Sequence, residues 1–172
     1  MIVAKFGGSS LADAGQFRKV RDIVLSDNRR RIIVPSAPGK RFDDDDKVTD
    51  LLYRCHKEHE QGMAFKQTFE QIRARYTEIA RDLRLGQDLA TELDRIEQAI
   101  GNGASQAYCA SRGEYLSGLM LAEYLGFPFV DAAEVVFLIK TAYLIQRKPI
   151  LLYLSVLQNC LFLFCPVFTA AT

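Results

Sequence analysis

A strand, a glycine-rich turn, a helix and a second strand follow one another at the start of this chain. Residues 2–6 are mostly apolar, and residues 13–26 carry apolar side chains at helical spacing. Residues 31–35, Arg-Ile-Ile-Val-Pro, form the next apolar run. A strand, a helix and a strand within so short a length predict a βαβ unit with two buried, parallel strands. We therefore expect an α/β fold built on a mainly parallel sheet.

The turn after the first strand has the composition of a phosphate-binding loop. Lys5 stands near the end of the strand, and Gly7, Gly8 and Ser9 follow it. Glycines let backbone N–H groups approach an anion, and the start of the next helix would add a favourable dipole. The spacing fits neither a Walker A loop nor a dinucleotide fingerprint. Two glycines after a strand also form ordinary turns, so these residues alone leave both interpretations open.

The second strand leads into a turn of small residues, Ser-Ala-Pro-Gly at positions 36–39. In a parallel sheet the carboxyl ends of neighbouring strands share one edge, which is where ligands bind. We therefore expect Ser36 and Gly39 to face the same cleft as Gly7 and Gly8. A plain proline turn is the alternative.

Two more polar residues stand at distinctive places in predicted helices. Thr49 lies at the start of a helix expected from residue 48 into the region 58–61, where its hydroxyl either caps the helix or contacts a substrate. Glu114 follows a glycine inside a helix expected over residues 105–125, which predicts a break that exposes its carboxylate. A solvated glutamate is the ordinary alternative.

The other segments give a coarser prediction. Further helices are expected over residues 65–83 and 88–100, and Gly126 is a suitable C-cap for the helix before it. Residues 127–131 are expected to lead into a short strand, and residues 133–138 to continue the sheet. The four consecutive aspartates at 43–46 are expected to lie in a mobile, solvated loop, with attraction of Mg²⁺ as the alternative.

Charge and cysteine content limit the classes of function. A net charge of +1 gives no electrostatic case for a nucleic-acid partner. The four cysteines contain no C-x-x-C pair, which favours free thiols in a reducing compartment. Cys55, His56 and His59 offer too few ligands for zinc, so no metal site is predicted. We expect a cytoplasmic protein, because Lys5 and the glycines interrupt the early apolar run that a signal peptide would need.

Five motifs in order resemble those of the aspartate kinase family, whose members have the amino-acid kinase fold. They are Lys-Phe-Gly-Gly-Ser-Ser at 5–10, Val-Pro-Ser-Ala at 34–37, Val-Thr-Asp-Leu-Leu at 48–52, Gly-Glu-Tyr-Leu-Ser at 113–117 and Val-Asp-Ala at 130–132. Pro35 departs from the more usual valine-serine-alanine. The resemblance implies that residues 1–137 are the N-terminal portion of the catalytic domain, an incomplete three-layer sandwich.

The resemblance also implies a reaction. Aspartate kinases transfer the γ-phosphoryl group of ATP, bound with Mg²⁺, to the side-chain carboxylate of L-aspartate, the first step toward lysine, threonine and methionine. Full-length members form homo-oligomers. By this resemblance Lys5 is the catalytic residue that neutralises the phosphoryl group, and the remaining residues bind the substrates. Gly7, Gly8 and Ser9 would bind ATP phosphates, and Ser36, Thr49 and Glu114 would bind aspartate, Glu114 through its α-ammonium group.

The last segment, residues 138–172, does not match the family. Residues 150–168 are nearly all apolar, with Gln158 and Asn159 near their centre. Three explanations are open: a shifted reading frame, a membrane segment, and buried core elements. The two polar residues argue against the membrane segment. Because the nucleotide-binding half of the family is not recognisable, we expect a truncated kinase that is inactive alone. Another amino-acid kinase, such as one acting on glutamate, and a non-catalytic or membrane-attached module are the alternatives.

Overall fold

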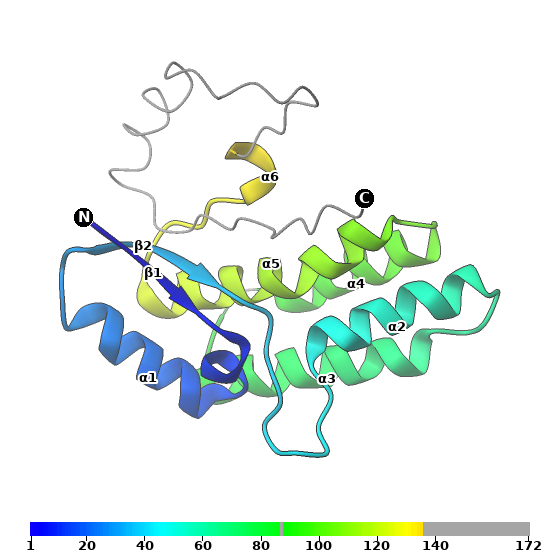
Figure 1. Cartoon of the computed structure of the whole chain (residues 1–172), viewed down its shortest axis with the longest axis horizontal. Coiled ribbons are helices and arrows are strands. Elements are labelled where there is room, and N and C mark those ends of the chain that lie inside the picture. The colour runs from blue at the N-terminus through cyan, green and yellow to red at the C-terminus, as the bar shows by residue number, and fades with distance from the viewer. Residues whose placement is uncertain (87, 136–172) are drawn as a thin grey trace, which may run out of the picture.

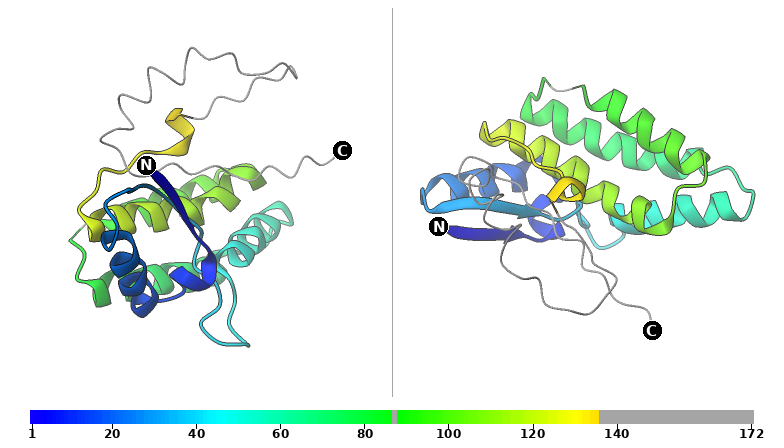
Figure 2. Two further views of the ribbon diagram at one scale, coloured as in Figure 1. Left: turned by 60° about the vertical axis from the view of Figure 1, so that its left-hand side comes forward. Right: turned by 90° about the horizontal axis from the view of Figure 1, so that it is seen from above.

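The structure is a computed structural model that describes residues 1–86 and 88–135 (Figure 1). A small sheet lies at one end of the molecule and a group of helices extends away from it (Figures 1 and 2). The elements are β1 (Ile2–Phe6), η1 (Gly8–Leu11), α1 (Ala14–Leu25), β2 (Arg30–Pro35), α2 (Val48–Glu60), α3 (Lys66–Leu83), α4 (Leu89–Gly101), α5 (Gln106–Leu125) and α6 (Ala132–Val135).

The predicted βαβ unit is confirmed. Strands β1 and β2 pair in parallel with Lys5 opposite Val34, and α1 connects them. The prediction that both strands are buried is wrong for β1. Its Val3 side chain is 59% exposed and only Phe6 is buried, because the described helices cover one face of this strand. The sheet seen in the described residues is therefore an incomplete α/β layer.

Helix ends follow the capping residues of the sequence. The Asp13 carboxylate accepts a hydrogen bond from the Gln16 N–H at 2.9 Å and starts α1. Ser105 caps α5 in the same way, and Gly126 ends that helix with a φ of 68°. Helices α2, α3, α4 and α5 were all predicted close to their observed bounds, because their apolar side chains recur at helical spacing.

Helix α5 forms the centre of the core. Its residues 116–122 are all buried, because α5 packs against β2 and against α1, α2, α3 and α4. A helical segment that is buried all round is typical of such a central position. Tyr76, Phe69 and Ile72 of α3 are fully buried in the same core. The core therefore joins the sheet end of the molecule to the helical end.

The strand predicted from residues 127–131 is wrong. These residues form a segment without regular secondary structure that leads into the short helix α6. The Phe129 ring packs edge-on against Tyr115, with centroids 5.5 Å apart, and lies where a Cβ atom of Gly118 would be. Side-chain packing on α5, and not a strand ladder, thus holds the segment. The rest of the expected sheet continuation, residues 136–138, lies outside the described residues.

Over residues 1–86 and 88–135, no helix has the length and apolar character needed to cross a membrane. The apolar run at 150–168 and the three explanations for it lie outside the described residues.

Candidate functional site

Two loops meet at the carboxyl edge of the β1–β2 sheet, as the sequence predicted. The Ser36 N–H donates to the Phe6 carbonyl at 3.0 Å, which continues the strand pairing by one residue. Beyond it, the Gly39 N–H donates to the Gly8 carbonyl at 2.8 Å. The loop after β1 and the loop after β2 are therefore joined by backbone hydrogen bonds.

This contact requires both glycines. A Cβ atom at Gly8 would lie 2.9 Å from the Ala37 carbonyl oxygen, and one at Gly39 would lie 2.7 Å from the Gly8 carbonyl carbon. Distances below 3.0 Å to a backbone atom leave no space for a side chain. Glycine permits the close approach of the two backbones. The packing of the two loops therefore requires glycine at both positions.

Lys5 lies beside the same loop. Its Nζ atom would be 3.6 Å from a Cβ atom placed at Gly7, so the lysine side chain lies over the glycine turn. Helix α1 begins at Ala14, as predicted, but the 3₁₀ turn Gly8–Leu11 lies between it and the glycines. The expected dipole contribution of the helix at this loop is therefore wrong. A macrodipole acts mainly within the first turn of its helix, so α1 contributes little at Gly7 and Gly8.

Glu114 lies on α5 next to the second loop. Its Oε2 atom is buried and has no hydrogen-bond partner among the described residues. Burial raises the pKa of Glu114, while a hydrogen bond from the Ala37 backbone and the charges of Arg112 and Lys5 lower that pKa. A buried carboxylate oxygen without a donor is costly unless a cation or hydrogen-bond donor reaches it. The site therefore presents an unsatisfied carboxyl oxygen beside Ala37 and within the electrostatic range of Lys5.

The predicted break in α5 is wrong, because the helix runs without interruption through residue 113. Gly113 has a packing role. A Cβ atom there would lie 2.6 Å from the Ala37 Cβ and 3.3 Å from the Leu52 Cδ1. The missing side chain lets the loop after β2 rest directly on α5, which brings Ala37 to Glu114.

Thr49 lies in the first turn of α2 and is half-buried. The backbone N–H of its neighbour Val48 donates to the Pro38 carbonyl at 3.1 Å. The start of α2 is thereby attached to the loop that carries Ser36, which is also half-buried. The two strand-end loops, the first turn of α2 and the Glu114 turn of α5 are therefore connected through direct contacts.

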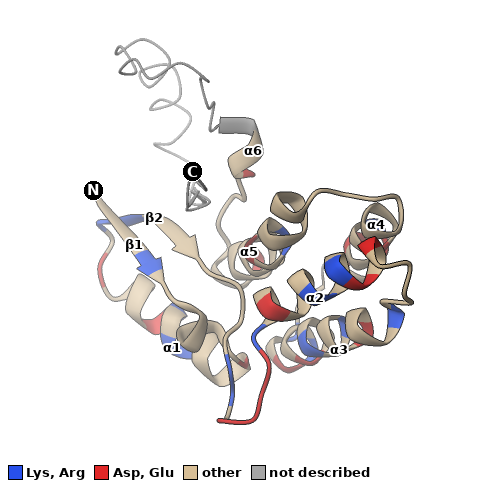
Figure 3. Ribbon diagram, turned by 45° about the vertical axis from the view of Figure 1, so that its right-hand side comes forward, with Lys and Arg blue, Asp and Glu red and all other residues tan. Residues whose placement is uncertain are grey.

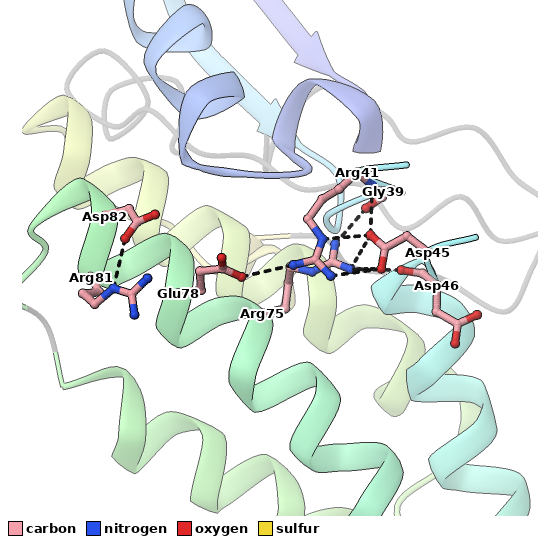
Figure 4. Close-up of polar contacts among 8 residues, drawn as sticks. All are labelled: Gly39, Arg41, Asp45, Asp46, Arg75, Glu78, Arg81 and Asp82. Atoms are coloured by element: carbon pink, nitrogen blue, oxygen red, sulfur yellow. Dashed lines mark hydrogen bonds and ion pairs between the residues drawn. The ribbon is translucent and has the colours of Figure 1, made fainter. Parts of the chain in front are cut away.

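Arg75 and Asp45 are two residues of this region that the sequence reasoning missed (Figure 4). Nη2 of Arg75 lies 2.6 Å from each carboxylate oxygen of Asp45, and Nη1 donates to the Gly39 carbonyl at 3.0 Å. Both side chains are buried. The Arg41 guanidinium, hydrogen-bonded to Asp45, holds the pKa of that carboxyl well below its usual range despite burial.

The acidic loop, red before α2 in Figure 3, therefore differs from the solvated loop that was predicted. Asp43 and Asp44 are exposed, but Asp45 is buried in its ion pair. The one signal for this pair in the sequence is that Arg75 falls on the apolar stripe of α3, three residues after Ile72 and four before Ile79.

Tyr76, the next residue of α3, was also missed. Its ring is fully buried and its hydroxyl donates to the Gly113 carbonyl at 2.6 Å. Burial raises the pKa of Tyr76 well above its usual value, so the hydroxyl keeps its proton.

Arg112 borders Glu114 on the other side. Its guanidinium lies over the rings of Tyr108 and Tyr115, 4.6 and 4.7 Å from their centroids. With Pro35 and Glu114 it lines a cavity of about 20 Å³, which is enough for roughly one water molecule.

Comparison with known proteins decides the family. The sequence model of the Amino acid kinase family matches residues 1–146. The chain belongs to the amino acid kinase family. Aspartokinase 3 of Bacillus subtilis is 44% identical over 93 residues, which are 54% of this chain and 20% of that protein.

Two solved members of the amino acid kinase family have a similar structure. The Clostridium acetobutylicum aspartate kinase has a TM-score of 0.77 and 52% identity, over 79% of this chain and 32% of that one. Escherichia coli aspartokinase III in complex with lysine and aspartate has a TM-score of 0.58 and 29% identity, over 73% of this chain and 29% of that one. The expected resemblance to aspartate kinases is confirmed, as is the amino-acid kinase fold. The chain spans about a third or less of these relatives.

Within the described part of this family member, no group of three or more His, Cys, Asp and Glu side chains is placed to hold a metal ion. The cysteines described are the buried free thiols Cys55 and Cys109. Burial raises the pKa of Cys55 to about 12. Cys160 and Cys165 lie outside the described residues.

Proposed function

We propose that the chain carries the phosphate- and aspartate-binding part of an aspartate kinase site. The reaction would form a bond between the γ-phosphorus of ATP and a side-chain carboxylate oxygen of L-aspartate, as the bond to the β-phosphate oxygen breaks and ADP leaves. The observation that carries the proposal is the buried, unpartnered Oε2 of Glu114 next to the loop that packs on Gly8. Such a site would bind the cationic group of one substrate close to the phosphate of the other.

Lys5 and the glycine turn would bind the phosphates of ATP. Phosphoryl transfer depends on positioning and on neutralising charge on the transferred group. The Lys5 ammonium over Gly7 would supply the charge, and the backbone N–H groups of Gly7, Gly8 and Ser9 would bind phosphate oxygens. Mg²⁺ would enter with the substrate as MgATP.

Glu114 would bind L-aspartate. An α-ammonium group at Oε2 would satisfy the buried oxygen and favour the ionised carboxylate. Ser36 and Thr49, both half-buried at the same edge, would contact the rest of the amino acid. The acceptor carboxylate has an ordinary pKa of about 4 and is ionised at neutral pH, so the reaction needs no general base.

The chain matches only part of the length of its relatives. Because the matched segment is about a third of the C. acetobutylicum aspartate kinase, we propose that residues 1–137 are the N-terminal portion of the catalytic domain and inactive alone. A cytoplasmic location is part of the same proposal.

A chimera tests the function. Residues 1–135 of this chain would replace the matching segment of the C. acetobutylicum aspartate kinase, and ATP-dependent phosphorylation of L-aspartate would be measured. We expect turnover in the chimera, a loss of at least about a hundredfold in Lys5→Met from removing transition-state charge stabilisation, and little change in Lys19→Met, an exposed lysine of α1. A folded chimera without turnover, or an active Lys5→Met variant, would contradict the proposal. Preference for L-glutamate would favour the other amino-acid kinase.

A further inference from the structure

Two adjacent residues of α3 hold the two sides of the candidate site. Arg75 donates to the Gly39 carbonyl, and Tyr76 donates to the Gly113 carbonyl. We propose that Arg75 and Tyr76 are positioning residues that fix the phosphate loop, residues 7–9 with the attached residues 36–39, relative to the turn of α5 that carries Glu114. This inference rests on the proposed function.

The Arg75 connection reaches the phosphate loop through one residue. The Gly39 carbonyl accepts from Arg75 at 3.0 Å, and the N–H of the same Gly39 donates to Gly8 at 2.8 Å. Nη2 of Arg75 contacts both carboxylate oxygens of Asp45, which fixes the guanidinium, and the side chains of Arg75 and Asp45 are buried. A guanidinium that donates through two nitrogens, one of them to a carboxylate, holds geometry better than a single neutral hydrogen bond. Displacement of Arg75 would therefore displace Gly39 and Gly8.

The Tyr76 connection reaches the aspartate side. Its hydroxyl lies 2.6 Å from the Gly113 carbonyl, one residue before Glu114. The ring is fully buried in the core, so the hydroxyl has a fixed position. Gly113 also carries the close contact with Ala37, so Tyr76 supports the junction between α5 and the loop after β2.

The helix geometry explains why neighbours in sequence serve different loops. Successive residues of an α-helix are about 100° apart around the axis, since a turn holds 3.6 residues. Arg75 therefore points to the Gly39 loop while Tyr76 points to α5, and Figure 4 shows the arginine reaching that loop from α3. Phosphoryl transfer is sensitive to misplacement of about 1 Å, so a rigid support shared by donor and acceptor subsites has a direct use.

Hydrogen–deuterium exchange of the full chain tests the positioning role. Arg75→Lys keeps the charge opposite Asp45 but removes the second nitrogen, which donates to the Gly39 carbonyl, and Tyr76→Phe removes only the hydroxyl. Losing one hydrogen bond of about 1 kcal/mol predicts roughly fivefold faster exchange. We expect this at residues 36–40 in Arg75→Lys and at residues 113–117 in Tyr76→Phe, with α4 unchanged. Arg73→Lys, whose side chain pairs with Glu97 of α4, and Tyr124→Phe are matched controls that leave both segments unchanged.

Ligand affinity gives the second measurement. Arg75→Lys is expected to raise the Kd of MgATP about fivefold and Tyr76→Phe that of L-aspartate, since each loses about one hydrogen bond of support. Each variant should leave the Kd of the other ligand nearly unchanged. Exchange that rises equally in all segments, or that matches the controls, would overturn the positioning role. A wild-type chain that binds neither ligand would contradict the proposed function instead, and the exchange data would still decide the positioning role.

Discussion

Gly39 and Gly8 approach each other so closely that neither backbone leaves room for a side chain. The Gly39 N–H lies 2.8 Å from the Gly8 carbonyl, and a Cβ on Gly39 would lie 2.7 Å from the Gly8 carbonyl carbon. This contact joins the loops that follow β1 and β2, so the architecture of the candidate site depends on it.

Gly39→Ala should therefore force the two loops apart. We expect a loss of about 1–3 kcal/mol in the free energy of unfolding, the usual cost of overpacking, and weakened MgATP binding. Gly101→Ala is the matched control, because a Cβ there meets only ordinary contacts at 3.8 Å from Phe65. Urea denaturation of both variants measures the difference. Equal stability of the two would show that the loops separate without cost.

Asp45→Asn should destabilise the fold by about 3 kcal/mol, because breaking one partner of a buried pair leaves a charge uncompensated. The exposed Asp43→Asn is the control and should stay within about 0.5 kcal/mol of wild type. Chemical denaturation at neutral pH measures both. A small effect of Asp45→Asn would mean that Arg41 and Arg75 find other partners.

The pH dependence of that pair has a definite sign. The pKa of Asp45 is depressed in the folded state, so its stabilisation is present above the ordinary aspartate pKa of about 4 and is lost as pH falls through the folded-state value. Wild-type stability should decline below about pH 4 more steeply than that of Asp45→Asn. Melting temperatures recorded between pH 2 and 7 would show whether the two curves converge in acid.

Glu114 should behave in the opposite way. Burial raises its pKa, so the folded state binds its proton more tightly, and stability falls as pH rises from the ordinary glutamate value, about 4.3, through the raised value. Glu114→Gln should therefore melt at a higher temperature than wild type at pH 7 and lose this advantage in acid. Glu70→Gln, on the exposed face of α3, is the control. A lower melting temperature for Glu114→Gln at pH 7 would contradict the assignment of an unsatisfied carboxylate.

The thiols of Cys55 and Cys109 should resist alkylation. Both are buried, and burial raises the pKa of each, so little thiolate forms at neutral pH. Iodoacetamide labelling followed by peptide mass spectrometry should find both unmodified in the native chain and modified in denaturant. Rapid native labelling of Cys55 would indicate that α2 opens readily.

Much of the local structure was predictable from the sequence. Helical spacing located α1 to α5, and Asp13 and Gly126 stand at the helix ends where capping preferences place them. The meeting of the Ser36 and Gly8 loops followed from the parallel βαβ unit alone.

The errors have a common physical cause, which is tertiary contact. Gly113 was interpreted as a break in α5, although its role is to admit Ala37, a residue distant in sequence. Asp45 was expected in solvent because its partner Arg75 lies 30 residues away. Residues 127–131 follow the packing of Phe129 on α5 instead of a strand ladder. Local patterns contain none of these long-range pairs.

Titration of L-aspartate into the full chain by calorimetry tests the central claim most directly. We predict saturable binding with one site per chain in wild type, and a loss of at least about tenfold in affinity in Glu114→Gln, because the α-ammonium group loses a charged hydrogen-bond partner. Glu70→Gln should bind as wild type does. Absence of binding in the folded wild-type chain, or equal affinity in wild type and Glu114→Gln, would contradict the assignment of Glu114 and Lys5 to an aspartate kinase site.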